Sequence, residues 1–132
     1  MDNALTSDKV AEFRKRLRDR RAEVLESIRQ ALLRSDNEHY IELAGTVHDS
    51  AEESVADQLS EMATALIGRQ VTEVREIEDA LQRVAVGAYG MCVECNKPIE
   101  LERLDVNPAA QRCYICQSRY EKTHAGAARP TL

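Results

Sequence analysis

All four cysteines of this chain lie in its last third, as two C-x-x-C pairs: Cys92 with Cys95, and Cys113 with Cys116. Seventeen residues separate the two pairs, a spacing typical of a tetrahedral zinc site with four thiolate ligands. Because thiolates would take all four positions, no position remains for water or substrate, and the expected Zn²⁺ is structural. Structural zinc contributes about 10 kcal/mol or more to small modules, so we expect it to hold residues 87–125 in their fold.

The residues around the cysteines suit such a module. Asn96 follows the first pair and favours the left-handed backbone that closes a tight turn. The second pair opens an expected helix from Tyr114 to about Thr123, whose N-terminal dipole favours thiolate over thiol. We expect the tyrosines of this region to pack around the metal: Tyr89, Tyr114 and Tyr120.

Two long segments have the periodicity of amphipathic helices, at about residues 7–33 and 55–86. As continuous helices each would be about 40–45 Å long. Arg21 interrupts the first apolar stripe, and we expect its stem to cover apolar surface while its guanidinium reaches water. The stripes consist of Val10, Phe13, Leu17, Val24, Ile28 and Leu32, and of Leu59, Met62, Leu66, Val74, Ile77, Leu81 and Val84.

One amphipathic helix cannot bury its own stripe, so the two segments are expected to pack on each other. The predicted fold class is all-α dominated: a long antiparallel coiled-coil helical hairpin, a small four-cysteine zinc finger and a C-terminal helix. The hairpin would span residues 1–86 with its tip at about 35–54, the finger with its helix 87–125, and a tail 126–132.

Charge is segregated along this hairpin. Residues 35–68 contain no Lys or Arg and eight carboxylates, whereas residues 14–21 contain six basic side chains. An unpaired acidic tip repels itself, so this segregation favours a docking surface over a merely solvated one.

Several function classes are not expected. The net charge of −5 argues against a protein that binds nucleic acid by neutralising phosphates. No segment resembles a signal peptide or a membrane span, so a cytosolic protein is expected. Nothing resembles a catalytic constellation, so we expect no enzyme. From the residues alone, a zinc-finger adaptor for a protein partner and a thiol-based redox sensor both stay open.

The finger resembles the C-terminal four-cysteine finger of the DksA/TraR family, and the preceding hairpin has that family's arrangement over roughly residues 40–120. This resemblance implies a monomeric bacterial transcription regulator that binds RNA polymerase rather than DNA. Its hairpin would enter the secondary channel, and its acidic tip would modulate the stability of open promoter complexes. The residues that carry the resemblance are Tyr89-Gly90-Met91-Cys92-Val93-Glu94-Cys95, Ile99, Arg103-Leu104, Pro108-Ala109 and Cys113-x-x-Cys116.

The resemblance also implies site residues in the hairpin. The family's tip motif, D-x-x-D-x-A, best matches residues 46–51, which keep Asp49 and Ala51 but have Thr46 in place of the first acid. This match lies about three residues farther from the finger than in the family, so Glu52 and Glu53 are further candidates. Arg69 matches a basic position that contacts the channel rim.

Relatives that respond to guanosine tetraphosphate (ppGpp) carry basic residues at three positions. The corresponding residues here look like Glu76, Asn107 and Gln117, none of which is basic. An anionic nucleotide would lose its partners at all three, so a ppGpp response is expected to be absent, weaker or differently placed.

Overall fold

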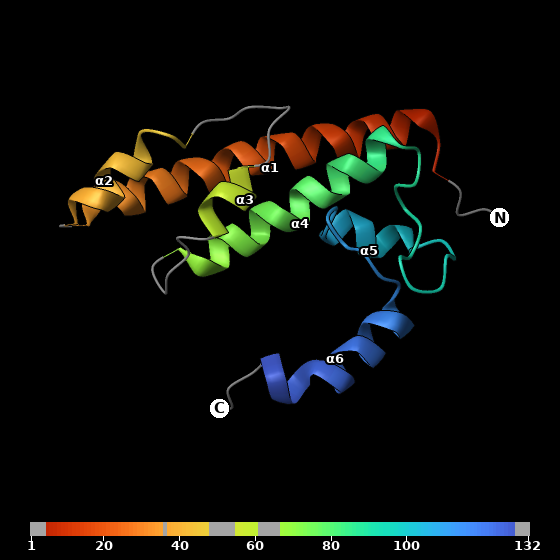
Figure 1. The fold of residues 1–132 in the computed structure, drawn as a ribbon. Coiled ribbons are helices and arrows are strands. Elements are labelled where there is room, and N and C mark those ends of the chain that lie inside the picture. Colours follow the sequence, from red (N-terminus) through yellow and green to blue (C-terminus); the bar gives the residue numbers. More distant parts are fainter. Residues whose placement is uncertain (1–4, 36, 48–54, 61–66, 129–132) are drawn as a thin grey trace.

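The computed structural model describes residues 5–35, 37–47, 55–60 and 67–128. Every regular element in these ranges is a helix (Figure 1), which confirms the predicted fold class. No helix in the described ranges is long and apolar enough to cross a membrane. The helices are α1 (Ser7–Arg34), α2 (Glu38–Ala44), α3 (Val55–Ser60), α4 (Gly68–Ala85), α5 (Leu101–Val106) and α6 (Tyr114–Ala128).

Helix α1 confirms the first predicted helix almost to the residue. The Thr6 hydroxyl accepts a hydrogen bond from the Lys9 N–H at 3.1 Å and caps the N-terminus. At the other end, Ser35 is extended, with φ −76° and ψ 157°, and terminates the helix. The buried face follows the predicted stripe from Phe13 to Leu32.

Helices α1 and α4 form the predicted antiparallel hairpin (Figure 1). Gln70 near the start of α4 donates a hydrogen bond to Ser27 late in α1, at 3.1 Å. Closer to the finger, Phe13 early in α1 shares an apolar cluster with Ala80 late in α4. Residue numbers therefore rise on one helix as they fall on the other.

The prediction of one continuous second helix is wrong. Ile67 has φ −126° and ψ 5°, outside the helical region, and α4 begins after it. The Val55 N–H, at the start of α3, donates to Glu78 Oε2 at 3.2 Å, although 23 residues separate the two. One straight helix would place them about 35 Å apart.

Helix α3 instead folds back onto the hairpin (Figure 1). Its residues Val55, Ala56 and Leu59 are buried in a cluster with side chains of both α1 and α4. Helix α4, with 18 residues, is about 27 Å long rather than 40–45 Å. Periodicity could not reveal this bend, because the spacing of the apolar residues Val55 and Leu59 is compatible with a straight helix and with a bent one.

Arg21 also differs from its prediction. Its side chain is only 4% exposed, and the guanidinium does not reach water as expected. Nε and Nη2 instead donate to Glu78 Oε2 at 3.0 and 2.8 Å, from α1 to α4. A buried guanidinium is stable in a protein interior only when it is paired and hydrogen-bonded. The partner of Arg21 lies 57 residues away in the sequence.

A second apolar cluster joins the hairpin to the finger. The ring of Phe13 lies 5.9 Å from that of Tyr89, centroid to centroid. Further members come from the base of the hairpin, from α5 and from the cysteine loops, so the finger does not stand apart from the helices. The buried members are Phe13, Leu17, Ile77, Ala80, Tyr89, Cys92, Ile99, Leu104, Ala109, Ala110, Cys113 and Cys116.

Candidate metal centre and partner surfaces

The first cysteine pair lies on a tight turn directly after the hairpin. Gly87 and Gly90 have positive φ values of 78° and 90°, which end α4 and reverse the chain. At Gly90 a Cβ would also lie 2.6 Å from a methyl carbon of Leu5. Asn96 has φ 63°, which confirms the left-handed residue predicted after this pair. The turn is closed by the Asn96 N–H, which donates to the Cys92 carbonyl at 2.9 Å.

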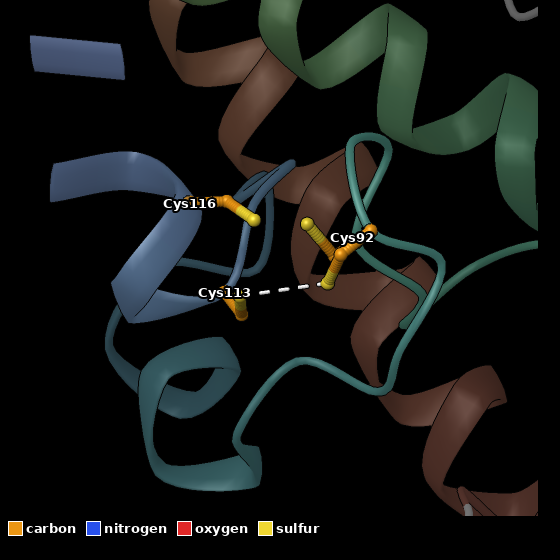
Figure 2. A group of neighbouring side chains, drawn as sticks. Cys92, Cys113 and Cys116 are labelled. Atoms are coloured by element: carbon orange, nitrogen blue, oxygen red, sulfur yellow. Dashed lines mark hydrogen bonds between the residues drawn. The ribbon is translucent and has the colours of Figure 1, made fainter. Parts of the chain in front are cut away.

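The second cysteine pair lies at the start of α6, as predicted. The Val93 N–H donates to the Gln111 carbonyl at 2.9 Å and so ties the two cysteine loops together. Figure 2 shows the thiols of Cys92, Cys113 and Cys116 gathered from these loops, and all four Sγ atoms, including that of Cys95, lie within 4.8 Å of one another. The structure therefore brings the four predicted ligands into one cluster.

The electrostatics of the cluster suit a metal cation. Burial opposes the thiolate of Cys92, but the N–H groups of Cys95, Cys113 and Glu94 outweigh it and lower the pKa of Cys92 to about 6. Burial, followed by the neighbouring sulfurs, raises the pKa of Cys116 to about 12. Four thiolates this close repel one another unless a cation lies between them. Four soft sulfur donors with no fifth ligand fit Zn²⁺ in a closed, structural site.

The tyrosines near the cluster behave differently from one another. Tyr89 is buried, its hydroxyl donates to the Pro108 carbonyl at 2.7 Å, and burial raises its pKa to about 12. Tyr114 is 65% exposed, so the prediction that it packs around the metal is wrong. Tyr120 stacks between the Arg112 guanidinium and the His124 ring, with a distance of 3.9 Å on each side. It therefore ties α6 to the loop before the second pair.

A groove of about 450 Å³ lies where α1, α4 and residues 107–109 meet. It brings together Arg69, the predicted rim residue, with Glu76 and Asn107, two of the three positions that the resemblance associates with a ppGpp response. Gln117, the third such position, lies on α6 and does not line the groove. The groove also contains Arg20, which holds Glu73 by two hydrogen bonds of 2.7 and 3.1 Å.

Glu76 is the unusual side chain of this groove. No hydrogen bond or ion pair of Glu76 is found within the described part of the chain. Burial raises its pKa, and repulsion from Glu73 and Asp79 adds to the shift. Glu76 therefore places an unpaired carboxylate in a groove that Arg16, Arg20 and Arg69 also line.

The predicted tip residues Asp49, Ala51, Glu52 and Glu53 lie outside the described residues. Their flanks are described on both sides. On the N-terminal side of the tip, Asn37 caps α2, its Oδ1 accepting a hydrogen bond from the His39 N–H at 2.8 Å. On the C-terminal side, α3 begins at Val55.

Two features of the finger escaped the sequence analysis. Helix α5 (Leu101–Val106) was not predicted, although Leu101 and Leu104, one helical turn apart, were a signal for it. Arg103 at its centre donates from Nε to the Arg112 carbonyl at 2.9 Å. This bond fixes α5 against the loop that carries the second cysteine pair.

Comparison with protein families gives a match to the prokaryotic dksA/traR C4-type zinc finger over residues 87–122, the segment that holds all four cysteines. The four-cysteine cluster is therefore the zinc site of this finger type, and the expected structural zinc is supported.

Among relatives, the chain is 32% identical over 124 residues to the RNA polymerase-binding transcription factor DksA of Caulobacter vibrioides, covering 92% of this chain and 82% of that protein. The solved structure of DksA2 from Pseudomonas aeruginosa matches with a TM-score of 0.64 and 26% identity, over 95% of this chain and 93% of that one. The regulator Dks of Chlamydia trachomatis matches in fold, with a TM-score of 0.55 and 20% identity over 96% and 100% of the two chains.

These matches extend over hairpin and finger alike, and not over the cysteine segment alone. Together with the zinc cluster and the helical hairpin, they show that the chain belongs to the DksA/TraR family.

Proposed function

We propose that this protein is a transcription regulator that binds RNA polymerase through the secondary channel. The observation that carries the proposal is the 32% identity over 124 residues to a factor named for RNA polymerase binding. That identity extends through the hairpin, which would be the polymerase-binding element, as well as through the finger.

The parts of the chain have distinct roles in this proposal. Residues 87–125 form a zinc-stabilised base, and residues 1–86 form the hairpin that enters the channel. Asp49, Ala51, Glu52 and Glu53 form the tip that modulates open-complex stability, and Arg69 contacts the rim of the channel. The protein acts as a cytoplasmic monomer, and its role is binding rather than catalysis.

The charge of the chain supports a protein partner over DNA. The net charge is −5, and among the basic residues of α1, Lys15, Arg16, Arg20 and Arg21 each pair with a carboxylate of the same chain. Cations already paired within the chain are poor partners for DNA phosphates. The carboxylates of residues 35–54, by contrast, have no Lys or Arg among them in the sequence.

We further propose that the regulator acts with little or no response to ppGpp. Glu76 places a carboxylate in the groove, and Asn107 beside it carries no charge. Replacing both by lysine and arginine (E76K/N107R) is expected to create or increase a ppGpp effect. Arg69→Ala should weaken polymerase binding whether or not ppGpp is present.

Competition for RNA polymerase tests the main proposal. The zinc-bound protein is expected to displace a labelled secondary-channel factor and to shorten open-complex lifetime at a sensitive promoter. Asp49→Asn should abolish the effect on lifetime and retain most of the binding, with Asn37→Asp as a control that leaves the α2 cap in place. Absence of competition at saturating protein would refute binding in the channel.

A further inference from the structure

The cations that α1 contributes to the groove are already paired within the chain. Arg16 donates to the Asp105 carbonyl at 2.7 Å, and another of its nitrogens lies 3.8 Å from the Asp105 carboxylate. Arg20 donates twice to Glu73, at 2.7 and 3.1 Å, and once to Glu23, at 3.2 Å. The side of the groove that α1 forms therefore has little charge left for a partner.

Two charges of opposite sign on α4 are left over, those of Arg69 and Glu76, and both side chains line the groove. Within the described ranges neither of them makes a hydrogen bond or an ion pair, and both residues are exposed. Seven residues separate them, which is two helical turns, so they lie on one face of α4 about 10.5 Å apart along its axis. A partner can therefore reach both charges from the same side.

The surroundings of Glu76 favour a cation from outside the chain. Partial burial, followed by repulsion from Glu73 and Asp79 on the same helix, raises the pKa of Glu76. Leu17 and Ile77 also line the groove, and an apolar lining reduces the screening of an ion pair by water. A cationic side chain that enters the groove would thus relieve a repulsion already present in the free protein.

We propose that Glu76 is a polymerase-binding residue that accepts a lysine or arginine side chain of RNA polymerase, while Arg69 pairs with a polymerase carboxylate about 10 Å away. This inference rests on the proposed function and names the chemistry of the partner at one place on the hairpin. The contact joins the two proteins directly, so it requires no ppGpp between them. Specificity comes from the order of the two charges along α4, because a partner with the reverse order would be repelled at both positions.

Competition for RNA polymerase by zinc-bound variants, in the absence of ppGpp, measures the contribution of Glu76. Glu76→Gln removes the charge and keeps the shape of the side chain, and we expect it to weaken binding about three- to fivefold. It should also make the affinity less dependent on salt, because one ion pair is lost. Glu76→Lys places a cation opposite a cation and should weaken binding more than tenfold.

Asp79→Asn is the matched control. It removes the same charge from the same helix, three residues further on, but Asp79 does not line the groove. Its affinity for polymerase should stay within about twofold of that of the unmodified chain. Thermal unfolding of each variant shows whether a loss of affinity comes from a loss of fold.

A Glu76→Gln protein that is folded and binds as tightly as the unmodified chain would overturn the inference. An equal loss in Asp79→Asn would also overturn it, because any carboxylate of α4 would then suffice. A loss in Glu76→Gln with unchanged salt dependence would mean that Glu76 acts by shape and not by charge. In these three cases the unmodified chain still competes, so the proposed function stands, whereas no competition by the unmodified chain would refute both.

Discussion

Phe13 lies where the hairpin meets the finger, and its replacement by alanine tests whether the two share one core. The side chain is 0% exposed, and its ring lies 5.9 Å from that of Tyr89. A buried aromatic side chain covers about 150–250 Å², worth roughly 4–6 kcal/mol at 25 cal/mol per Å², of which alanine keeps a small part. We therefore expect Phe13→Ala to lower the free energy of unfolding by about 4 kcal/mol, within the range found for buried Phe→Ala changes.

Urea unfolding of the zinc-bound protein, followed by circular dichroism at 222 nm, measures this change. Phe13→Leu keeps an apolar side chain at the joint and should cost less than about 1.5 kcal/mol. Val106→Ala is the surface control, because Val106 is 86% exposed, and it should change stability by less than about 0.5 kcal/mol.

The result that would refute the reasoning is a Phe13→Ala protein within about 1 kcal/mol of the unmodified chain. Such a small loss would mean that the Phe13 ring contributes little packing energy. The finger and the base of the hairpin would then not share one core. A second unfolding transition in that variant would point the same way, because a shared core predicts that both parts unfold together.

Two further outcomes are expected. Glu76→Gln should stabilise the protein at pH 7, because burial, with repulsion from Glu73 and Asp79, raises the pKa of Glu76 and makes its charged form unfavourable in the folded state. Thermal unfolding measured as a function of pH should show that this gain in stability shrinks below about pH 4, where the carboxyl is protonated in both states. A gain in stability that is independent of pH would contradict the prediction. Cys92→Ser, or removal of zinc with a chelator, should unfold residues 87–125, and elemental analysis should find one zinc per unmodified chain and none in the variant; an unaltered melting curve would disprove a structural metal.

Sequence reasoning was most successful where the determinants are local. The helix that became α1 carries its own cap and stripe, and the finger carries its ligands at fixed spacing, so both could be predicted. The left-handed Asn96 followed from the chemistry of a single side chain.

Sequence reasoning failed where the determinant lies far away in the chain. Arg21 was expected to reach water, yet its partner Glu78 lies 57 residues away in the sequence. The fold-back of α3 depends on the same carboxylate. The exposure of Tyr114 depends on the direction in which α6 leaves the finger, and the local sequence pattern does not determine that direction. The assignment of Asp49 and its neighbours to the tip stays a prediction.

The joint around Phe13 also has a consequence for biosynthesis. Phe13 packs in a cluster with Leu104 and Cys116, and nearby Arg16 donates to the Asp105 carbonyl 89 residues later at 2.7 Å. At a translation rate of 5–20 residues per second, the partners of Phe13 emerge roughly 5–20 s after it does. During that interval the side chains of Phe13 and Leu17 lack the finger residues that cover them in the folded protein, so α1 exposes an apolar surface. The large separation in sequence between the two sides of this joint thus implies a delay between synthesis of Phe13 and its burial.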